Sequence, residues 1–167
     1  MNHRATFALT AALLVSCAPS PETGTDAAQA SRPAMMPSAA NFDVGPIMSA
    51  ESYLEDAEYA DADLERGELL SLACIACHTL EAGRDHVLGP NLSGVFGAAA
   101  AQKPGFEYSP ALVNAGLVWT PRALDAWLAA PARFVPGTSM VFAGYADSED
   151  RRNLIAYLLG ATQVPPQ

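Results

Sequence analysis

Two cysteines and a histidine lie together in the pentapeptide Cys74-Ile75-Ala76-Cys77-His78. The C-x-x-C-H spacing is typical of covalent attachment of a c-type haem. The two thiols are spaced to form thioethers with the two vinyl groups on one edge of a porphyrin. The adjacent histidine can then offer a neutral imidazole nitrogen to the iron. The pentapeptide therefore predicts one covalently bound haem c per chain.

Three other uses of this cysteine pair are less consistent with the sequence. A redox-active C-x-x-C is expected between a strand and a helix, and that setting is missing here. A zinc site would need a second pair of ligands, but no further cysteine and no His-x-x-x-His follow the motif. A disulfide within C-x-x-C is strained and uncommon. Haem attachment is therefore the favoured interpretation.

An iron bound to His78 needs a second axial ligand. Met140 is the only methionine after residue 49, and it ends the segment Phe134-Val135-Pro136-Gly137-Thr138-Ser139-Met140. The proline and glycine favour a stiff loop, which suits a thioether pressed against a metal better than a core-filling methionine. His86 is the rival, but it follows His78 too closely for the chain to pass easily to the opposite face of the haem. We expect Met140 to be the ligand and His86 to be a surface-loop residue.

The charge balance limits the classes of partner. The 167 residues carry 18 acidic and nine basic side chains, a formal net charge of −9, so the chain offers no basic stripe for nucleic acid. Between residues 61 and 160 there are eleven acidic and seven basic residues, and Lys103 is the only lysine of the chain. Long-range steering toward an acidic partner is therefore expected to be weak.

The first 16 residues are typical of an export signal. Two basic residues precede an apolar run over residues 5–15, which is too short to span a bilayer because spanning needs about 20 residues. The run ends in Leu14-Val15-Ser16-Cys17, similar to the lipobox of bacterial lipoproteins. We expect cleavage before Cys17 and acylation of that cysteine, which would tether the protein to a membrane on the periplasmic side. Ala18 replaces the aspartate that retains lipoproteins in the inner membrane, and the sequence assigns neither membrane.

Residues 17–60 are expected to form a lipid-anchored, flexible tether. The first half is rich in Ala, Pro, Ser and Thr, and the second half is acidic. Such a composition buries too little apolar surface to offset the entropy of ordering, so no structure is predicted there. The methionines of this segment are interpreted as linker residues rather than haem ligands. The haem domain is expected over residues 61–162, and residues 163–167 form a C-terminal tail.

Helical periodicity runs through the expected haem domain, and no alternating pattern long enough for a strand occurs. Helices are expected over residues 63–74, 109–115, 121–130 and 148–159. Gly67 costs about 1 kcal/mol relative to alanine inside the first of these, so another helix, the C-terminal one, should cross closely there. The fold class is predicted to be all-α, with the N-terminal and C-terminal helices of the domain crossing around one haem.

The stretch from Gly67 to Tyr157 resembles a class I c-type cytochrome, of the mitochondrial cytochrome c and bacterial cytochrome c2 type. The matching segments follow the family's order and spacing. They are Cys74–Thr79, Gly89–Leu92, Gly94–Gly97, Pro104–Pro110, Trp119, Phe134–Met140, Phe142–Gly144 and Leu154–Leu158. The resemblance implies a small all-α haem domain that carries single electrons, here in a membrane-tethered, lipid-anchored form.

The resemblance also implies roles for single residues. His78 would be the proximal ligand, with its other ring nitrogen oriented by the Pro90 carbonyl. Tyr108 and Trp119 would donate hydrogen bonds to a buried haem propionate, and the alternative for both is aromatic packing. Thr138 matches another residue that bonds a propionate, and otherwise it is a turn residue.

The chain departs from the family at several positions near the expected haem. Trp127 stands where the family usually has a tyrosine that contacts the ligand sulfur, so the potential and the methionine–iron bond are expected to differ. Ala98 replaces a usual arginine and Leu112 a usual asparagine, which leaves fewer donors for the propionates and favours a lower potential. The family's ring of docking lysines is largely missing.

The implied function is single-electron transfer between membrane redox complexes. The donor would be a quinol–cytochrome c oxidoreductase, and the acceptor a terminal oxidase or a photosynthetic reaction centre, with no small-molecule substrate. An iron with histidine and methionine ligands has no open position, which favours outer-sphere transfer over catalysis. Two alternatives stay open on the sequence alone. One is a haem enzyme of the peroxidase type with a dissociable Met140, and the other is a non-redox exported lipoprotein in which C-x-x-C-H is accidental.

Overall fold

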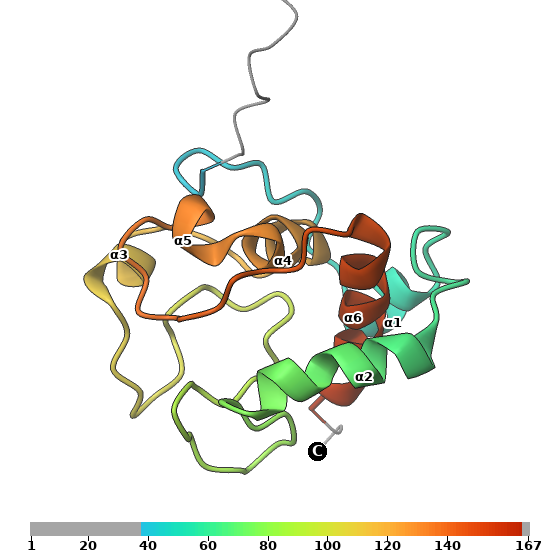
Figure 1. The fold of residues 1–167 in the computed structure, drawn as a ribbon, viewed down its shortest axis with the longest axis horizontal. Helices are drawn as coiled ribbons and strands as arrows, with labels where there is room; N and C mark the ends of the chain where they lie inside the picture. The colour runs from blue at the N-terminus through green and yellow to red at the C-terminus, as the bar shows by residue number, and fades with distance from the viewer. Residues whose placement is uncertain (1–37, 165–167) are drawn as a thin grey trace, which may run out of the picture. The chain divides into compact units, whose positions relative to one another are not determined.

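The structure, a computed structural model, describes residues 38–164. Within this range the chain folds into helices connected by long loops (Figure 1). The helices are α1 (Ala50–Leu54), α2 (Leu64–Ile75), α3 (Pro110–Val113), α4 (Pro121–Ala129), α5 (Pro131–Phe134) and α6 (Ser148–Ala161). The only extended pairing in these residues is an isolated antiparallel bridge between Ala99 and Val118. The prediction of an all-α fold is confirmed.

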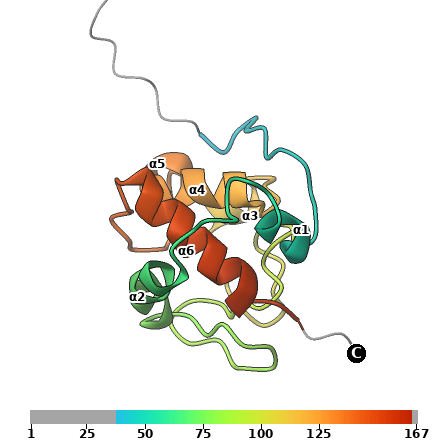
Figure 2. The same cartoon turned by 90° about the vertical axis from the view of Figure 1, so that its right-hand side faces the viewer.

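Helices α2 and α6 cross at the glycine of α2 (Figures 1 and 2). A Cβ atom on Gly67 would lie 2.8 Å from the carbonyl carbon of Asn153 and 2.8 Å from Cβ of Tyr157, closer than real Cβ atoms approach. A two-point ion pair also joins the helices, because Arg66 donates to both carboxylate oxygens of Asp150 at 2.8 and 2.7 Å. The close crossing predicted from the cost of Gly67 is therefore present.

Side-chain caps fix where α4 and α6 begin. The Thr120 hydroxyl accepts a hydrogen bond from the backbone nitrogen of Ala123 at 3.2 Å. The Asp147 carboxylate accepts one from the nitrogen of Asp150 at 2.9 Å. Each cap satisfies a backbone donor that has no partner inside its helix. Both helices begin where they were expected, at residues 121 and 148, although α6 continues to Ala161 and not only to residue 159.

Pro131 begins a helix that the sequence did not predict. Helix α4 ends at Ala129, before this proline as expected. Pro131 is then the first residue of α5, a position where its missing N–H is not needed. The last residue of α5, Phe134, is almost fully buried at 1 % exposure. Helix α5 thus fixes the start of the loop that leads to Met140.

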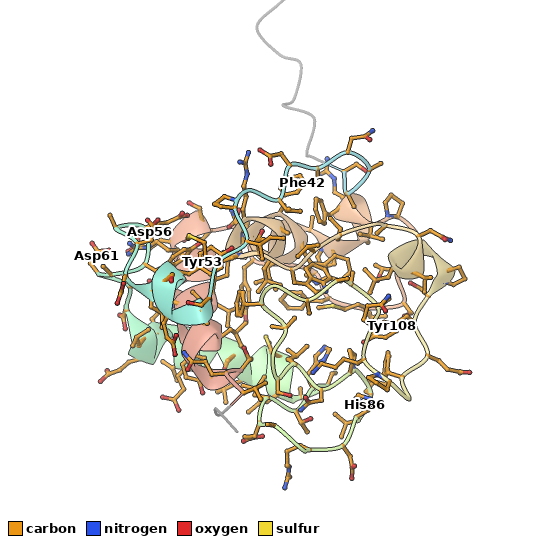
Figure 3. The ribbon with its side chains drawn as sticks, turned by 180° about the vertical axis from the view of Figure 1, so that it is seen from behind. Phe42, Tyr53, Asp56, Asp61, His86 and Tyr108 are labelled. Atoms are coloured by element: carbon orange, nitrogen blue, oxygen red, sulfur yellow. The ribbon has the colours of Figure 1, made fainter. Side chains whose placement is uncertain are left out.

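Residues 38–60 pack on the rest of the domain, so the prediction that they are unstructured is wrong. The ring of Phe42 meets the ring of Phe134 edge-on, with 5.0 Å between their centroids. Tyr53 of α1 is buried, and α1 packs against α6. Figure 3 labels the side chains of Phe42 and Tyr53 in this segment. The segment has few apolar side chains, but several of them pack against the core. The expected tether residues 17–37 lie outside the described part of the chain.

The core is formed mainly by α4 and α6. Trp127 and Leu128 of α4 and Leu154 and Ile155 of α6 are all nearly inaccessible to solvent. Apolar side chains from the connecting loops pack against this cluster. Among residues 38–164 no helix is both long and apolar enough to cross a bilayer.

Candidate haem site

The C-x-x-C-H segment makes one more turn at the end of α2. The backbone nitrogens of Cys77 and His78 both donate to the carbonyl oxygen of Cys74, at 3.0 and 2.9 Å. This turn gathers both cysteines and the histidine at one end of α2, and both thiols are free. The local geometry therefore supplies the paired sulfurs that attachment to one porphyrin edge requires.

The Cys74 thiol is in an environment that favours its protonated form. Burial, with a smaller contribution from the neighbouring Cys77, raises the pKa of Cys74 to about 11. Redox-active C-x-x-C pairs instead rely on a thiol whose pKa is lowered. The site therefore gives no support to thioredoxin-like chemistry.

The imidazole of His78 is held in one tautomer. Its Nδ1 lies 2.7 Å from the carbonyl oxygen of Pro90, so Nδ1 carries the proton and Nε2 keeps its lone pair. Burial lowers the pKa of His78, and the hydrogen bond to Pro90 opposes this effect. A neutral ring with a free Nε2 is the form that can bind a metal. The Pro90 contact, expected only from the resemblance, is present in the structure.

Gly89 lies directly against the His78 ring. A Cβ atom at residue 89 would be 2.7 Å from Nδ1 and 2.8 Å from Nε2, so only glycine fits there without moving the ring. The nitrogen of Gly89 also donates to the carbonyl oxygen of Cys77 at 2.7 Å. The backbone of this loop therefore sets both the position and the tautomer of His78.

Asn91 holds the same loop in place, a role that the sequence analysis did not assign. Its side-chain nitrogen donates to the hydroxyl of Thr79 at 2.9 Å and to the carbonyl oxygen of Glu81 at 2.9 Å. Asn91 is 5 % exposed, so these bonds are shielded from water. The sequence signal that could have indicated this role is the place of Asn91 in Gly-Pro-Asn-Leu, directly after Pro90.

Met140 lies in the loop between α5 and α6, as Pro136 and Gly137 predicted. The carbonyl oxygen of Val135 accepts from the nitrogen of Thr138 at 3.1 Å, and the Thr138 hydroxyl accepts from the nitrogen of Met140 at 3.2 Å. The Met140 side chain is partly buried and packs against the core. The hydroxyl oxygen of Thr138 is thus used inside the loop, while its own proton remains available for another acceptor.

His86 lies in a loop, as expected, and it also connects this loop to a second one. Its Nδ1 accepts from the nitrogen of Asn91 at 2.9 Å, and its Nε2 donates to the carbonyl oxygen of Pro104 at 3.0 Å. Its ring also contacts Phe106, with 5.5 Å between centroids. Because both ring nitrogens have protein partners, neither is free to bind iron in this arrangement.

The aromatic residues expected near the haem fall into two groups. Trp119 and Trp127 pack edge-on at 5.5 Å, and Trp127 is 5 % exposed. Tyr108 packs edge-on against Phe106 at 4.9 Å, in the loops on the same side of the molecule as His86 (Figure 3). Burial raises the pKa of Tyr108, so its hydroxyl stays protonated and can donate.

These residues fit a covalent haem. Two adjacent thiols, a neutral imidazole with its proton fixed on the far nitrogen, and a thioether on a separate loop are the donor types that such a group uses. When bound, haem c supplies an iron that takes up and releases one electron. An all-α domain with crossing first and last helices and this donor set defines the class I c-type cytochromes.

Comparisons with known proteins agree with this class, although no family model matches the chain. The chain is 40% identical over 101 residues to cytochrome c of Sesamum indicum, covering 60% of this chain and 91% of the relative. It is 43% identical over 107 residues to cytochrome c of Chlamydomonas reinhardtii, covering 64% and 96%. It is also 38% identical over 109 residues to cytochrome c2 of Agrobacterium tumefaciens (strain II Chrys), covering 64% and 98%.

The chain belongs to the cytochrome c family. It is an electron-transfer protein, not an enzyme, and it carries one covalently attached haem c. The peroxidase-type alternative and the non-redox alternative are therefore set aside. Cys17, the expected lipidation site, lies outside the described residues.

Proposed function

We propose that His78 and Met140 are the two axial ligands of the haem iron. The single observation that carries this assignment is the 2.7 Å contact between Nδ1 of His78 and the Pro90 carbonyl, because it leaves Nε2 unprotonated. Met140 is supported as the second ligand by its place on a loop tied to the core and by the engagement of both ring nitrogens of the rival His86.

Two matched variants test the ligand assignment. Met140→Ala should abolish the weak near-infrared charge-transfer band of methionine ligation in the ferric protein, because it removes the thioether. His86→Ala should keep that band, since His86 connects loops and does not bind iron. A wild-type ferric protein without the band, whose spectrum changes in His86→Ala but not in Met140→Ala, would assign the iron to His86 and refute the proposal.

Cys74 and Cys77 form the thioethers in this proposal, and four further side chains contact the haem. Tyr108, Trp119 and Thr138 donate toward the propionates, and Trp127 lies near the ligand sulfur. The raised pKa of Tyr108 supports a donor role, and the Thr138 hydroxyl has a proton to give. Mass spectrometry should find one haem on the Cys74/Cys77 peptide, and haem on any other peptide would contradict the assignment.

The carrier works, in this proposal, between membrane redox complexes on the periplasmic side. Residues 1–16 direct export, and an acylated Cys17 anchors the protein. The domain is short of basic residues, so charge contributes little to the encounter. An anchor would compensate by raising the effective concentration of the domain near its partners. The cytochrome c2 relative supports a bacterial carrier role.

The anchor can be tested apart from the haem. Cys17→Ser should still produce haem-bearing protein but release it into the soluble periplasmic fraction. Its electron transfer to washed membranes should then fall with dilution, while that of the anchored form should not. Soluble wild-type protein, or membrane-bound Cys17→Ser, would refute anchoring and leave the haem assignment intact.

A further inference from the structure

The segment over residues 38–45, here called the strap, lies across the beginning of α4 and the end of α5. Its first anchor is Ala39, which is 7% exposed and whose nitrogen donates to the carbonyl oxygen of Phe134 at 2.9 Å. The second anchor is Phe42, whose ring meets the Phe134 ring at 89° and 5.0 Å. Both anchors contact Phe134, the last residue of α5.

The other end of the strap is fixed to the first turn of α4. The Thr120 hydroxyl donates to the carbonyl oxygen of Val44 and accepts from a nitrogen in that turn, so one side chain joins the strap to the helix cap. Arg122 pairs with Asp43 at 3.2 Å, and its guanidinium lies 5.9 Å from the centre of the Phe42 ring. The Arg122–Asp43 pair is exposed and contributes little, so Phe42 and the Thr120 bond hold this end.

The strap therefore acts on the start of the loop that carries Met140. Phe134 is followed directly by Val135, which is 3 % exposed and whose carbonyl closes the turn with Thr138. Thr138 in turn bonds the nitrogen of Met140. The peptide bond from Phe134 to Val135 and these two hydrogen bonds form a continuous chain of contacts. A displacement of Phe134 would therefore displace Met140.

The far end of the same loop is fixed by other elements. The nitrogen of Tyr145 donates to the carbonyl oxygen of Leu128 in α4 at 2.8 Å, and its hydroxyl donates to that of Leu70 in α2 at 2.9 Å. Gly144 lies so close to Ala129 that a Cβ atom there would be 2.8 Å from the Ala129 carbonyl carbon. Helices α2 and α4 thus hold one end of the loop, and the strap holds the other.

We propose that the strap is a positioning element for Met140, with Phe42 as its principal side chain. By holding Phe134 in place, the strap holds the loop that carries Met140 (the methionine loop) in the position in which Met140 can bind the iron. It thereby disfavours forms in which Met140 has dissociated. This inference rests on the proposed ligation by Met140. It assigns a redox role to a segment whose composition alone suggested a linker.

The test uses the full-length haem-bearing protein and exogenous imidazole, which competes with Met140 for ferric iron. Titration with imidazole, followed by loss of the near-infrared band, reports how readily the loop opens. Phe42→Ala should bind imidazole about tenfold more tightly than wild type, a coupling typical of residues linked through a shared backbone shift. Its reduction potential should fall. The thioether of Met140 stabilises ferrous iron relative to ferric iron, and a weaker bond to the iron reduces this stabilisation.

Phe96→Ala is the matched control. Phe96 is another partly buried aromatic residue, but it lies beside Leu159 and Thr162 at the end of α6, away from the methionine loop. Both variants should lower the denaturant midpoint of unfolding, because both remove an aromatic ring. Only Phe42→Ala should change imidazole affinity and potential.

The outcomes separate the strap from the ligand assignment. Equal imidazole affinity in Phe42→Ala and wild type, with the band intact in both, would overturn the strap proposal alone. A wild-type protein without the band would overturn ligation by Met140 and this inference with it. If Phe42→Ala fails to fold, Phe42→Leu should still show an intermediate rise in imidazole affinity, and wild-type affinity in Phe42→Leu would overturn the proposal.

Discussion

Gly89 lies against the imidazole of His78 so closely that a Cβ atom at residue 89 would be 2.7 Å from Nδ1. The ring is also fixed by the carbonyl oxygen of Pro90, which lies 2.7 Å from Nδ1. The position and tautomer of His78, the proposed proximal ligand, thus come from two consecutive residues of one loop. A change at either residue is therefore expected to act on the proposed iron site through the ring.

Gly89→Ala should displace the His78 ring and weaken haem binding. Residues that orient a metal-bound histidine typically change metal affinity about 10–100-fold, so we expect a roughly tenfold loss of haem-bearing protein at equal expression. Haem-stained gels calibrated by total protein measure this. Gly160→Ala is the control, because no atom lies within 4 Å of a Cβ there, and it should leave haem content unchanged. Normal haem content in Gly89→Ala would contradict the orienting role.

Gly67→Ala should open the crossing of α2 and α6. The added Cβ would strike the Asn153 backbone, which cannot move without shifting α6. We expect the free energy of unfolding to fall by about 3 kcal/mol, at the upper end of overpacking effects. Urea unfolding followed by far-UV circular dichroism measures it. Gly160→Ala should instead be neutral or stabilising by up to about 1 kcal/mol, and an equal loss in both variants would show that the crossing is not tight.

Ala98→Arg should raise the reduction potential. The carbonyl oxygen of Ala98 accepts from the nitrogen of Trp119 at 2.9 Å, so the new guanidinium would start from a residue hydrogen-bonded to a proposed propionate donor. Neutralising a propionate disfavours the oxidised haem, and we expect a rise of roughly 30 mV, about 0.7 kcal/mol for a partly exposed charge pair. Spectroelectrochemical titration measures it. Ala98→Gln controls for size and should change the potential less; an unchanged potential in Ala98→Arg would refute this account.

Asp150→Asn should reduce stability at neutral pH but not in strong acid. The hydrogen bonds from Arg66 lower the pKa of Asp150 below its ordinary value of 3.8. A carboxyl whose pKa is lower in the folded state stabilises the fold above its unfolded pKa, and this contribution is lost as the pH falls through the folded pKa. The difference between variant and wild type should therefore vanish below the folded-state pKa. Glu149→Gln removes an acid from the same turn without touching this pair and should lack that pH dependence. Parallel pH profiles for both variants would contradict the prediction.

Local signals in the sequence were sufficient for the main helices and for the haem motif. The energetic cost of Gly67 predicted a crossing. The starts expected at residues 121 and 148 agree with α4 and α6, because helix caps depend only on nearby residues. Helix α5 was missed because Pro131 was interpreted as the end of one helix, although proline equally favours the first position of the next.

The strap and His86 could not be predicted in this way. Ala39 and Phe134 are far apart in the chain, so neither composition nor periodicity indicates that they meet. Segment composition predicted disorder because it averages over many polar residues and gives no weight to a single buried ring such as Phe42. The two hydrogen bonds of His86 likewise join loops whose relative position depends on the whole fold.

The most direct test of the central claim is the absorption spectrum of the purified wild-type protein in both oxidation states, extended into the near infrared and combined with a pyridine haemochrome assay. The account predicts a c-type haemochrome with one haem per chain and, in the ferric protein, the weak charge-transfer band of methionine ligation. A c-type haemochrome without that band would contradict ligation by His78 and Met140.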